Sequence, residues 1–587
     1  MNLNRLFPFL DWLPLRLETF RADLTSGVTV ALVAIPQSLA YAQLAGLPPY
    51  YGLYAALIPT VMGALFGSSG VLSTGPVAMT SLLTAASIAP LAAPASDLFV
   101  VYAILLALIS GLFQILFGVL RMGVLLNFLS HPVLMGFINA AAIIISLAQI
   151  PTLLGISASQ SKHLLTDTWH VIVNIDRMHE LSLVFGITAI AALVAFRKRA
   201  PRFPGVLVTV AVLTVLSYLV GYESMGGRVV GTVPQGLPKI GVPALDWHAM
   251  LVVTPAGFLI AVISFMEAMS SCRIIAIRTR TRWDENQELI GQGLAKIASA
   301  VSHSFPVSGS FSRSALNLAT GAKTGMSSII AATMVLLTLL VLTPLLHHLP
   351  KPVLAAIIIV AVVNLVDVRS IRNAWLASRD DGIAAVVTFM ATLLFAPNIQ
   401  IGILAGIIFS LSVLLYRLMR PRVVVHGLLA DGSLKDPDEL RRAGIHPAIG
   451  VLQFDGRLLF VNVAYFEQAL LRLARENAQL KYIVVVCYGI NGIDASGVER
   501  LSDVVERLKT SGIQVVLGGV KQQVLSVMER TGLAEKIGTE NFFDTRRKAL
   551  EAARERLYAQ AAESRQAEEA AATDDKQATA SPTTRST

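Results

Sequence analysis

Charged residues are scarce in this chain of 587 residues, because Asp, Glu, Lys and Arg together make up only 14% of it, whereas 54% is hydrophobic. Residues 25–96 contain no charged side chain at all, and neither do residues 122–161. The surface of a soluble protein would not tolerate uncharged stretches of this length. The composition therefore excludes a soluble globular protein and predicts an integral membrane protein.

Cysteine is also scarce. The chain has two, Cys272 and Cys487, and their spacing fits neither a disulfide framework nor a metal site. No nucleophile–base set and no metal cluster stands out, so the sequence predicts neither an enzyme nor a cofactor. The formal net charge of +9 could suggest nucleic acid as a partner. The basic residues cluster at the ends of apolar segments, however, where anchoring on the cytoplasmic side of a bilayer explains them better.

About fourteen apolar segments are predicted to span a membrane, seven in each half of the hydrophobic region. They are residues 28–46, 53–66, 76–93, 99–120, 124–149, 181–196, 205–221, 255–277, 289–302, 310–320, 326–346, 352–366, 382–396 and 401–416. Clusters of Lys and Arg follow the even-numbered segments. Because such clusters stay on the cytoplasmic side, both termini are predicted to be cytoplasmic.

The third and tenth segments are short, and they occupy matching places in the two halves, which indicates an inverted repeat. In the tenth, Pro306 and Gly309 end any preceding helix, and a new helix can begin near Ser310. The first turn of that helix contains Arg313. A helix N-terminus inside a membrane offers unpaired N–H groups and partial positive charge, so a guanidinium beside it predicts an anion site.

The chain changes character after the last apolar segment. Residues 1–422 are predicted to form the membrane domain, 423–439 a polar linker, and 440–558 a soluble α/β domain. Within the α/β domain, residues 451–461 are predicted to form a hairpin that turns at Asp455-Gly456. Residues 559–587, rich in Ala, Glu, Ser, Thr and Gln, are predicted to be disordered.

Several motifs resemble those of the sulfate permease (SulP) family of anion transporters, in which a cytoplasmic STAS domain follows the membrane part. They are Ile35-Pro-Gln-Ser-Leu-Ala-Tyr41, Pro49-Tyr-Tyr-Gly-Leu-Tyr-Ala-Ala56, Thr74-Gly-Pro-Val-Ala78, Phe305-Pro-Val-Ser-Gly-Ser-Phe-Ser-Arg-Ser314 and Ile493-Asp-Ala-Ser-Gly497. The resemblance covers nearly the whole chain. One departure is Gly70, which follows Gly67-Ser-Ser69 where the family usually has a basic residue.

The resemblance implies a core bundle that moves against a gate bundle, with the anion held between the half-helices of the third and tenth segments. It also implies a homodimer in the inner (plasma) membrane. The substrate-binding residues that it implies are Gln37, Tyr41, Pro76, Val77, Ala78, Ser310, Phe311, Ser312 and Arg313.

Three further residues stand out, and two of them allow two readings. Glu267 is an acid inside an uncharged segment, where it could couple an ion to transport or pair with Arg273 or Arg313 as a structural partner. Lys296 interrupts the ninth segment, and we expect its long side chain to reach the membrane surface. Ser496 resembles the phosphorylatable serine of bacterial STAS relatives, but it could equally be an N-cap.

The leading functional hypothesis is a secondary active transporter that moves a small anion in symport with a proton. Sulfate is favoured, while bicarbonate, chloride and C4-dicarboxylates remain open. One alternative is an anion exchanger or channel, uncoupled or coupled to sodium. Another is a membrane sensor that signals anion binding through the STAS domain.

Overall fold

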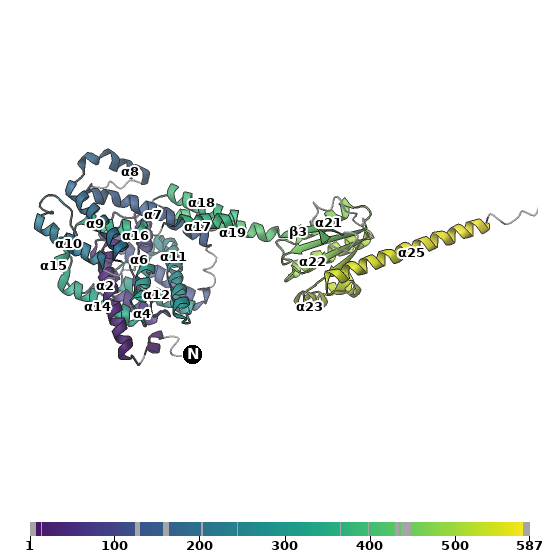
Figure 1. Ribbon diagram of the computed structural model, residues 1–587, viewed down its shortest axis with the longest axis horizontal. Coiled ribbons are helices and arrows are strands. Elements are labelled where there is room, and N and C mark those ends of the chain that lie inside the picture. Colours follow the sequence, from purple (N-terminus) through teal and green to yellow (C-terminus); the bar gives the residue numbers. More distant parts are fainter. Residues whose placement is uncertain are drawn as a thin grey trace, which may run out of the picture. The chain divides into compact units, whose positions relative to one another are not determined.

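The computed structural model divides the chain into two compact units, Met1–Leu411 and Ser412–Thr587 (Figure 1). The residues that it describes are 7–12, 14–123, 130–156, 164–200, 204–243, 245–363, 366–396, 398–428, 434–435 and 448–578. The first unit is almost entirely helical, and the second contains a six-stranded sheet. Residues 429–433 and 436–439 of the predicted linker, and residues 440–447 of the predicted α/β domain, lie outside the described residues.

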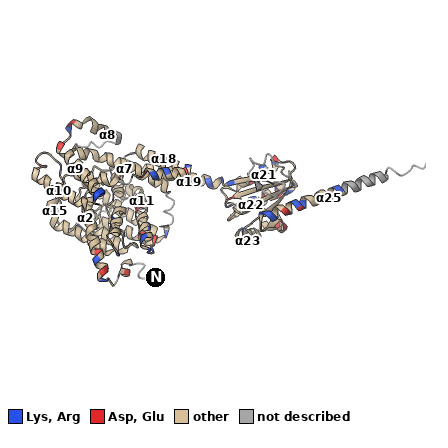
Figure 2. Ribbon diagram, in the orientation of Figure 1, with Lys and Arg blue, Asp and Glu red and all other residues tan. Residues whose placement is uncertain are grey.

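Each of the fourteen predicted segments contains a helix. These helices are α2 (Leu17–Leu44), α3 (Tyr50–Ala55) with α4 (Ile58–Phe66), α5 (Ala78–Ile88), α6 (Asp97–Val119), α7 (His131–Leu154), α9 (Glu180–Arg199), α10 (Gly205–Val220), α11 (Trp247–Thr279), α12 (Glu285–Val301), α13 (Phe311–Ala319), α14 (Met326–Leu337) continuing through a π-helical turn (Thr338–Leu342) into α15 (Thr343–Leu346), α16 (Lys351–Val363), α18 (Arg379–Leu394) and α19 (Ile399–Met419). In the described part of the chain, eight helices are long and apolar enough to cross a membrane. Charged residues are sparse along the helices of this unit (Figure 2).

Two helices of the first unit were not predicted. They are α8 (Leu164–Val173) and α17 (Val368–Ala377), each of ten residues. Helix α17 contains two arginines, and most of its side chains are exposed. It therefore lacks the continuous apolar run by which a membrane-spanning helix is recognised. Neither helix is therefore among the predicted membrane-spanning segments.

The helices of the first unit pack as two bundles. Helices α2 to α6 contact α11 to α14, whereas α7, α9 and α10 contact α16 to α18. The bundles meet where α2 contacts α10 and α16. Three connections join them: the one between α6 and α7, the one between α10 and α11, and the one between α15 and α16. This arrangement confirms the expected core and gate bundles.

The short helices α5 and α13 begin beside each other. Two residues shortly before each helix form a small antiparallel sheet, in which β1 (Thr74–Gly75) pairs with β2 (Ser308–Gly309). Pro76 and Pro306 prevent a helix from running through either segment. Gly75 adopts a φ of 157°, and a side chain here would lie 3.0 Å from Nη2 of Arg313, so glycine is the residue that fits. Both predicted half-helices are therefore present.

The second unit is a sheet with helices on both faces (Figure 1). Its elements are β3 (Arg422–Leu428), β4 (Leu434–Lys435), β5 (Ile449–Asp455), α21 (Val463–Glu476), β6 (Tyr482–Val486), α22 (Ala495–Thr510), β7 (Gln514–Gly518), α23 (Gln522–Arg530), α24 (Leu533–Ile537), β8 (Phe542–Phe543) and α25 (Arg546–Ala578). The strand order is β4-β3-β5-β6-β7-β8, with β5 to β8 parallel and β3 antiparallel to β5. Burial raises the pKa of the Cys487 thiol to about 12, so this cysteine is an inert packing residue.

Three predictions for the C-terminal part were wrong. The predicted hairpin does not form, because β5 pairs with β3 and β6, and Leu458 bridges instead to Ile493. The predicted linker contains β3, so the sheet begins at Arg422. The predicted disordered tail is helical as far as Ala578, since α25 begins as a packed helix that covers one face of the sheet and then continues.

Buried carboxylates fasten two loops of the first unit. Asp23 on α2 is fully buried, and its Oδ1 accepts hydrogen bonds from the backbone N–H groups of Lys323 (2.7 Å) and Thr324 (3.2 Å). Glu288 on α12 accepts from the backbone N–H groups of Ser68 (2.9 Å) and Ser69 (3.0 Å). Each carboxylate thus satisfies two partly buried N–H groups and stabilises a connection between helices.

We expect Asp23→Ala to lower the stability of the membrane domain. The change leaves the N–H groups of Lys323 and Thr324 without their acceptor in a partly buried loop, and hydrogen bonds to a charged group contribute about 1.5–3 kcal/mol each. Thermal unfolding of the purified protein in detergent should show a clear fall in the midpoint. The matched control is Glu18→Ala, since Glu18 is an exposed acid at the start of the same helix. Equal midpoints for Asp23→Ala and Glu18→Ala would contradict the assigned role of Asp23.

Candidate functional site

Arg313 lies at the junction of the two short helices. It belongs to the first turn of α13, whose N-cap is Ser310, and its side chain is 2% exposed. The junction is closed by hydrogen bonds in both directions: the Ser310 N–H donates to the Ser73 carbonyl (2.8 Å), and the Ser73 N–H donates to Oγ of Ser314 (2.9 Å). The guanidinium is therefore held beside the starts of both helices.

The guanidinium is only partly used by the protein. Its Nη1 donates to the carbonyl oxygen of Pro76 at 2.8 Å, and Nε lies 3.4 Å from Oγ of Ser73. Nη2 is buried and has no hydrogen-bond partner. An arginine buried in a membrane domain with an unused donor is costly unless a ligand completes it. Pro76 and Arg313 are thus joined by a hydrogen bond behind the cavity described next.

A cavity of about 490 Å³ lies at the starts of α5 and α13. Eight of the ten residues predicted for binding and coupling line it, contributed by four helices and the residues that precede two of them. These residues are Gln37, Tyr41, Val77, Ala78, Glu267, Ser310, Phe311 and Ser312. The structure therefore brings together residues that are separated by more than two hundred positions in the sequence, and it places neither Pro76 nor Arg313 in the lining.

Glu267 lies within α11 and faces this cavity. Its Oε2 is buried and has no hydrogen-bond partner. Among the described residues, Glu267 forms no ion pair with Arg313, and Arg273 pairs instead with Glu285 at 3.4 Å. The reading of Glu267 as one half of a structural ion pair is therefore not supported by a contact. Its carboxyl group remains available to a proton or a cation.

The prediction that Lys296 reaches the membrane surface was wrong. Lys296 is fully buried in α12, and its Nζ donates to Oε1 of Gln114 at 2.8 Å. Gln114 on α6 in turn donates to the Ala261 carbonyl (2.8 Å) and to Oγ of Ser264 (3.1 Å), one turn before Glu267. The buried ammonium also interacts electrostatically with Glu267. Lys296 is thus a second buried cation near the cavity, and its position inside an apolar segment was the available signal.

Gln37 and Tyr41 lie one turn apart on α2, and both are nearly buried. Oε1 of Gln37 has no hydrogen-bond partner in the protein. The hydroxyls of Ser310 and Ser312, which also line the cavity, lie 3.4 Å apart. The cavity thus combines neutral polar groups with the starts of two helices, which is a surface suited to an anion.

Sequence reasoning missed part of the cavity lining. The end of α9 and the start of α10 contribute Phe196, Arg197 and Gly205, and α16 contributes Ile357 and Val360. These residues belong to the second bundle, so the cavity lies between the two bundles. They are ordinary apolar and basic residues of membrane helices, and no motif distinguishes them.

Two other residues that the sequence singled out, Ser496 and Gly70, do not belong to the cavity lining. Ser496 is not the N-cap of α22, because Asp494 occupies that place and accepts a hydrogen bond from the Gly497 N–H at 2.8 Å. Its alternative role as a phosphorylation site stays a prediction. Gly70 does not line the cavity; it follows the two amides that bind Glu288.

Comparison with known proteins identifies the same two parts of the chain. Residues 20–388 match the sulfate permease family, and residues 442–549 match the STAS domain. The chain is 33% identical to a protein named probable sulfate transporter 4.2 of Arabidopsis thaliana over 562 residues, which cover 92% of this chain and 82% of the relative. It is 32% identical to a probable sulfate transporter of Mycobacterium tuberculosis over 540 residues, 91% of this chain and 96% of the relative.

Solved structures share the fold. The murine Solute Carrier 26 family member A9 anion transporter, in an inward-facing state, aligns with a TM-score of 0.85 at 21% identity over 95% of this chain and 94% of its own. The transmembrane domain of the cyanobacterial bicarbonate transporter BicA aligns with a TM-score of 0.58 at 22% identity over 67% of this chain and 98% of its own. On its sequence, its two domains and its fold, this chain belongs to the sulfate permease family.

Proposed function

We propose that this chain is a secondary active transporter of a small anion, with sulfate as the favoured substrate, and that a proton moves with the anion. The observation that carries the proposal is the position of Arg313. A buried guanidinium with an unused Nη2 stands at the junction of two helix starts, beside a cavity that also contains Glu267. Membership of the sulfate permease family and the names of the relatives support anion transport and favour sulfate.

Positive electrostatic potential at the starts of α5 and α13 attracts the anionic substrate to the cavity. Helices α5 and α13 each direct N–H groups and partial positive charge toward their starts. Arg313 adds a full charge, and the low polarity of the surroundings strengthens its attraction for an anion. Hydroxyl and amide groups of Ser310, Ser312 and Gln37 can then hydrogen-bond oxygen atoms of the anion. A divalent oxyanion gains more from this charge than a monovalent anion does.

Glu267 provides the coupling. An ionised carboxylate in the same cavity repels the arriving anion, whereas a protonated carboxyl leaves the attraction of Arg313 and the two helix starts unopposed. Anion and proton therefore favour each other's binding, by an equal factor in both directions. Lys296 is a buried amine that interacts electrostatically with Glu267 and, through Gln114, is linked by hydrogen bonds to the turn that precedes it.

The cavity supports alternating access with the site open to the cytoplasm. Its lining includes Arg197 at the end of α9, in the basic cluster predicted to lie on the cytoplasmic side. Because one bundle contributes α5, α11 and α13 and the other contributes α9, α10 and α16, a movement between bundles would close this face and open the other. We place both termini in the cytoplasm, the protein in the inner (plasma) membrane and the functional unit as a homodimer.

We expect Arg313→Ala to weaken sulfate binding by roughly 30- to 100-fold, which corresponds to about 2–3 kcal/mol for a charge-assisted hydrogen bond. Chloride binding should fall less. Arg313→Lys should restore part of the affinity, because an ammonium keeps the charge but lacks the guanidinium geometry. Binding of radiolabelled sulfate to purified protein measures the effect, and Arg369→Ala is the control because Arg369 is exposed on α17. Unchanged affinity in Arg313→Ala would leave Arg313 a purely structural residue.

We expect Glu267→Gln to retain anion binding and exchange but to lose uphill uptake driven by an inward proton gradient. Glutamine resembles the protonated acid in shape and charge, so it keeps the binding site and removes the proton. Concentrative uptake in proteoliposomes, with and without the gradient, tests this, with Glu180→Gln as the control at an exposed position. If Glu267→Gln accumulates sulfate as wild type does, the coupling residue is another one. A requirement for a sodium gradient in wild type would replace the proton by sodium.

We also expect a chain that ends at Met419 to bind the anion. Every residue that lines the cavity lies in the unit Met1–Leu411, and β3 of the second unit begins only at Arg422. The STAS domain should therefore modulate the transport rate without contributing to the site. Radiolabelled sulfate binding to the truncated and the full chain measures this. Complete loss of binding by a truncated chain that remains monodisperse would contradict the division of roles.

A further inference from the structure

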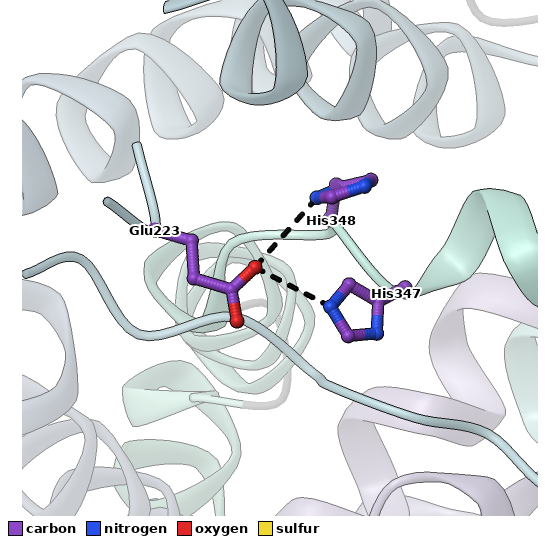
Figure 3. A group of neighbouring side chains, drawn as sticks. All are labelled: Glu223, His347 and His348. Carbon is purple, nitrogen blue, oxygen red and sulfur yellow. Dashed lines mark ion pairs between the residues drawn. The ribbon is translucent and has the colours of Figure 1, made fainter. Parts of the chain in front are cut away.

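Three metal-ligating side chains converge at a place that the anion site does not use. Glu223 follows the end of α10, and His347 and His348 follow the end of α15 (Figure 3). Oε2 of Glu223 lies 3.3 Å from Nε2 of His347 and 3.8 Å from Nδ1 of His348. The candidate ligand atoms of all three residues lie within 4.8 Å of one another. No motif in the sequence predicts this cluster, because more than a hundred residues separate Glu223 from the two histidines.

The spacing of these atoms fits a tetrahedral metal ion. Zinc binds imidazole nitrogen and carboxylate oxygen at about 2.0–2.2 Å, so neighbouring ligand atoms in a tetrahedron lie roughly 3.3 Å apart. The 3.3 Å distance from Glu223 to His347 matches this value, whereas the 3.8 Å distance to His348 and the 4.8 Å span of the group exceed it, so the side chains would draw closer around an ion. Two imidazoles and one carboxylate form a ligand set for zinc and similar borderline metals, whereas magnesium and calcium prefer oxygen alone. The fourth position is left for water.

The surroundings favour an exchangeable site. The side chains of Glu223, His347 and His348 are 49%, 30% and 35% exposed, so an ion can enter and water can complete its coordination. The ring of His348 packs against Tyr218, with centroids 4.9 Å apart, and the carbonyl of His347 accepts a hydrogen bond from the Gly231 N–H at 3.1 Å. The first contact orients the ring of His348, and the second holds the backbone of His347 in place.

The cluster lies where two connections between the bundles meet. The segment after α10 leads to α11 of the other bundle, and the segment after α15 leads back to α16. The two segments pair as extended chains: the Val230 N–H donates to the Leu349 carbonyl, and the Lys351 N–H donates to the Arg228 carbonyl, both at 2.9 Å. An ion held by Glu223, His347 and His348 would therefore tie one connection to the other.

We propose that Glu223, His347 and His348 form a regulatory site for a divalent transition metal of the zinc class, and that its occupancy restrains the movement between the two bundles. Binding of the metal depends only on the three side chains and their geometry. The effect on transport rests on the proposed function, since it requires that the bundles move during the cycle. A restrained connection slows interconversion of the inward-open and outward-open states without changing the anion site.

Zinc binding to the purified full chain in detergent tests the site itself. We expect saturable binding of one zinc ion per chain, measured by titration calorimetry with zinc chloride, and no saturable binding of magnesium. The double substitution His347→Ala and His348→Ala should weaken zinc binding by at least about tenfold, because two of three ligands are lost. His248→Ala is the matched control, since His248 is exposed and its ring lies outside the cluster. Equal zinc affinity in wild type and the double variant, or no saturable binding by wild type, overturns the proposal.

Sulfate uptake by proteoliposomes tests the regulatory effect separately. Zinc should lower the uptake rate of wild type and of His248→Ala but not that of the double variant, with sulfate affinity unchanged in all three. If zinc binds as expected and uptake is unaffected, the site is not regulatory and that part of the proposal fails. If wild type shows no uptake at all, the proposed function fails while the binding result stands. Glu223→Gln, which keeps the size of the side chain, replaces the double variant if the latter unfolds, and it should also weaken zinc binding.

Discussion

The hydrogen bond from Arg313 to the Pro76 carbonyl, together with the β1–β2 pair around it, is the contact on which the membrane domain is built. Two helices that begin inside a bilayer leave backbone groups that lipid cannot satisfy. Here the strands β1 and β2 hydrogen-bond some of these backbone groups to each other. The Arg313 guanidinium donates to the Pro76 carbonyl, which has no place in the hydrogen bonding of either helix. The same solution concentrates positive potential in one place, so the requirement of the backbone and the requirement of an anion are met together.

The remaining buried charges follow the same logic. Asp23 and Glu288 each accept two backbone N–H groups at a connection between helices, and neither lines the cavity. Lys296 donates to Gln114, which joins α12 to α6 and α11. Glu267 differs, because its Oε2 has no partner and the residue faces the cavity. Satisfied charges thus hold the core bundle together, and the one with an unpaired oxygen is Glu267, for which we proposed a coupling role.

Local sequence was sufficient where short-range rules decide the structure. The apolar segments, the break at Pro306 and the helix start at Ser310 were all predicted, and each is present. Local rules failed for the hairpin at Asp455-Gly456, because β5 has two partners that are distant in sequence, β3 and β6. They also failed for the tail, where a composition typical of disorder belongs to a helix whose first turns cover the sheet.

The sequence by itself determined that this is a membrane protein of paired half-helices with a soluble α/β domain, because hydropathy, proline and glycine act over a few residues. Motif resemblance added Gln37, Tyr41 and Val77 to the predicted site. Only the tertiary structure decided that Lys296 is buried. It also decided that Phe196 and Val360 of the second bundle complete the cavity lining. It alone brought Glu223 to the two histidines. These are contacts between segments far apart in the chain, and no periodicity of one segment records which other segment will pack against it.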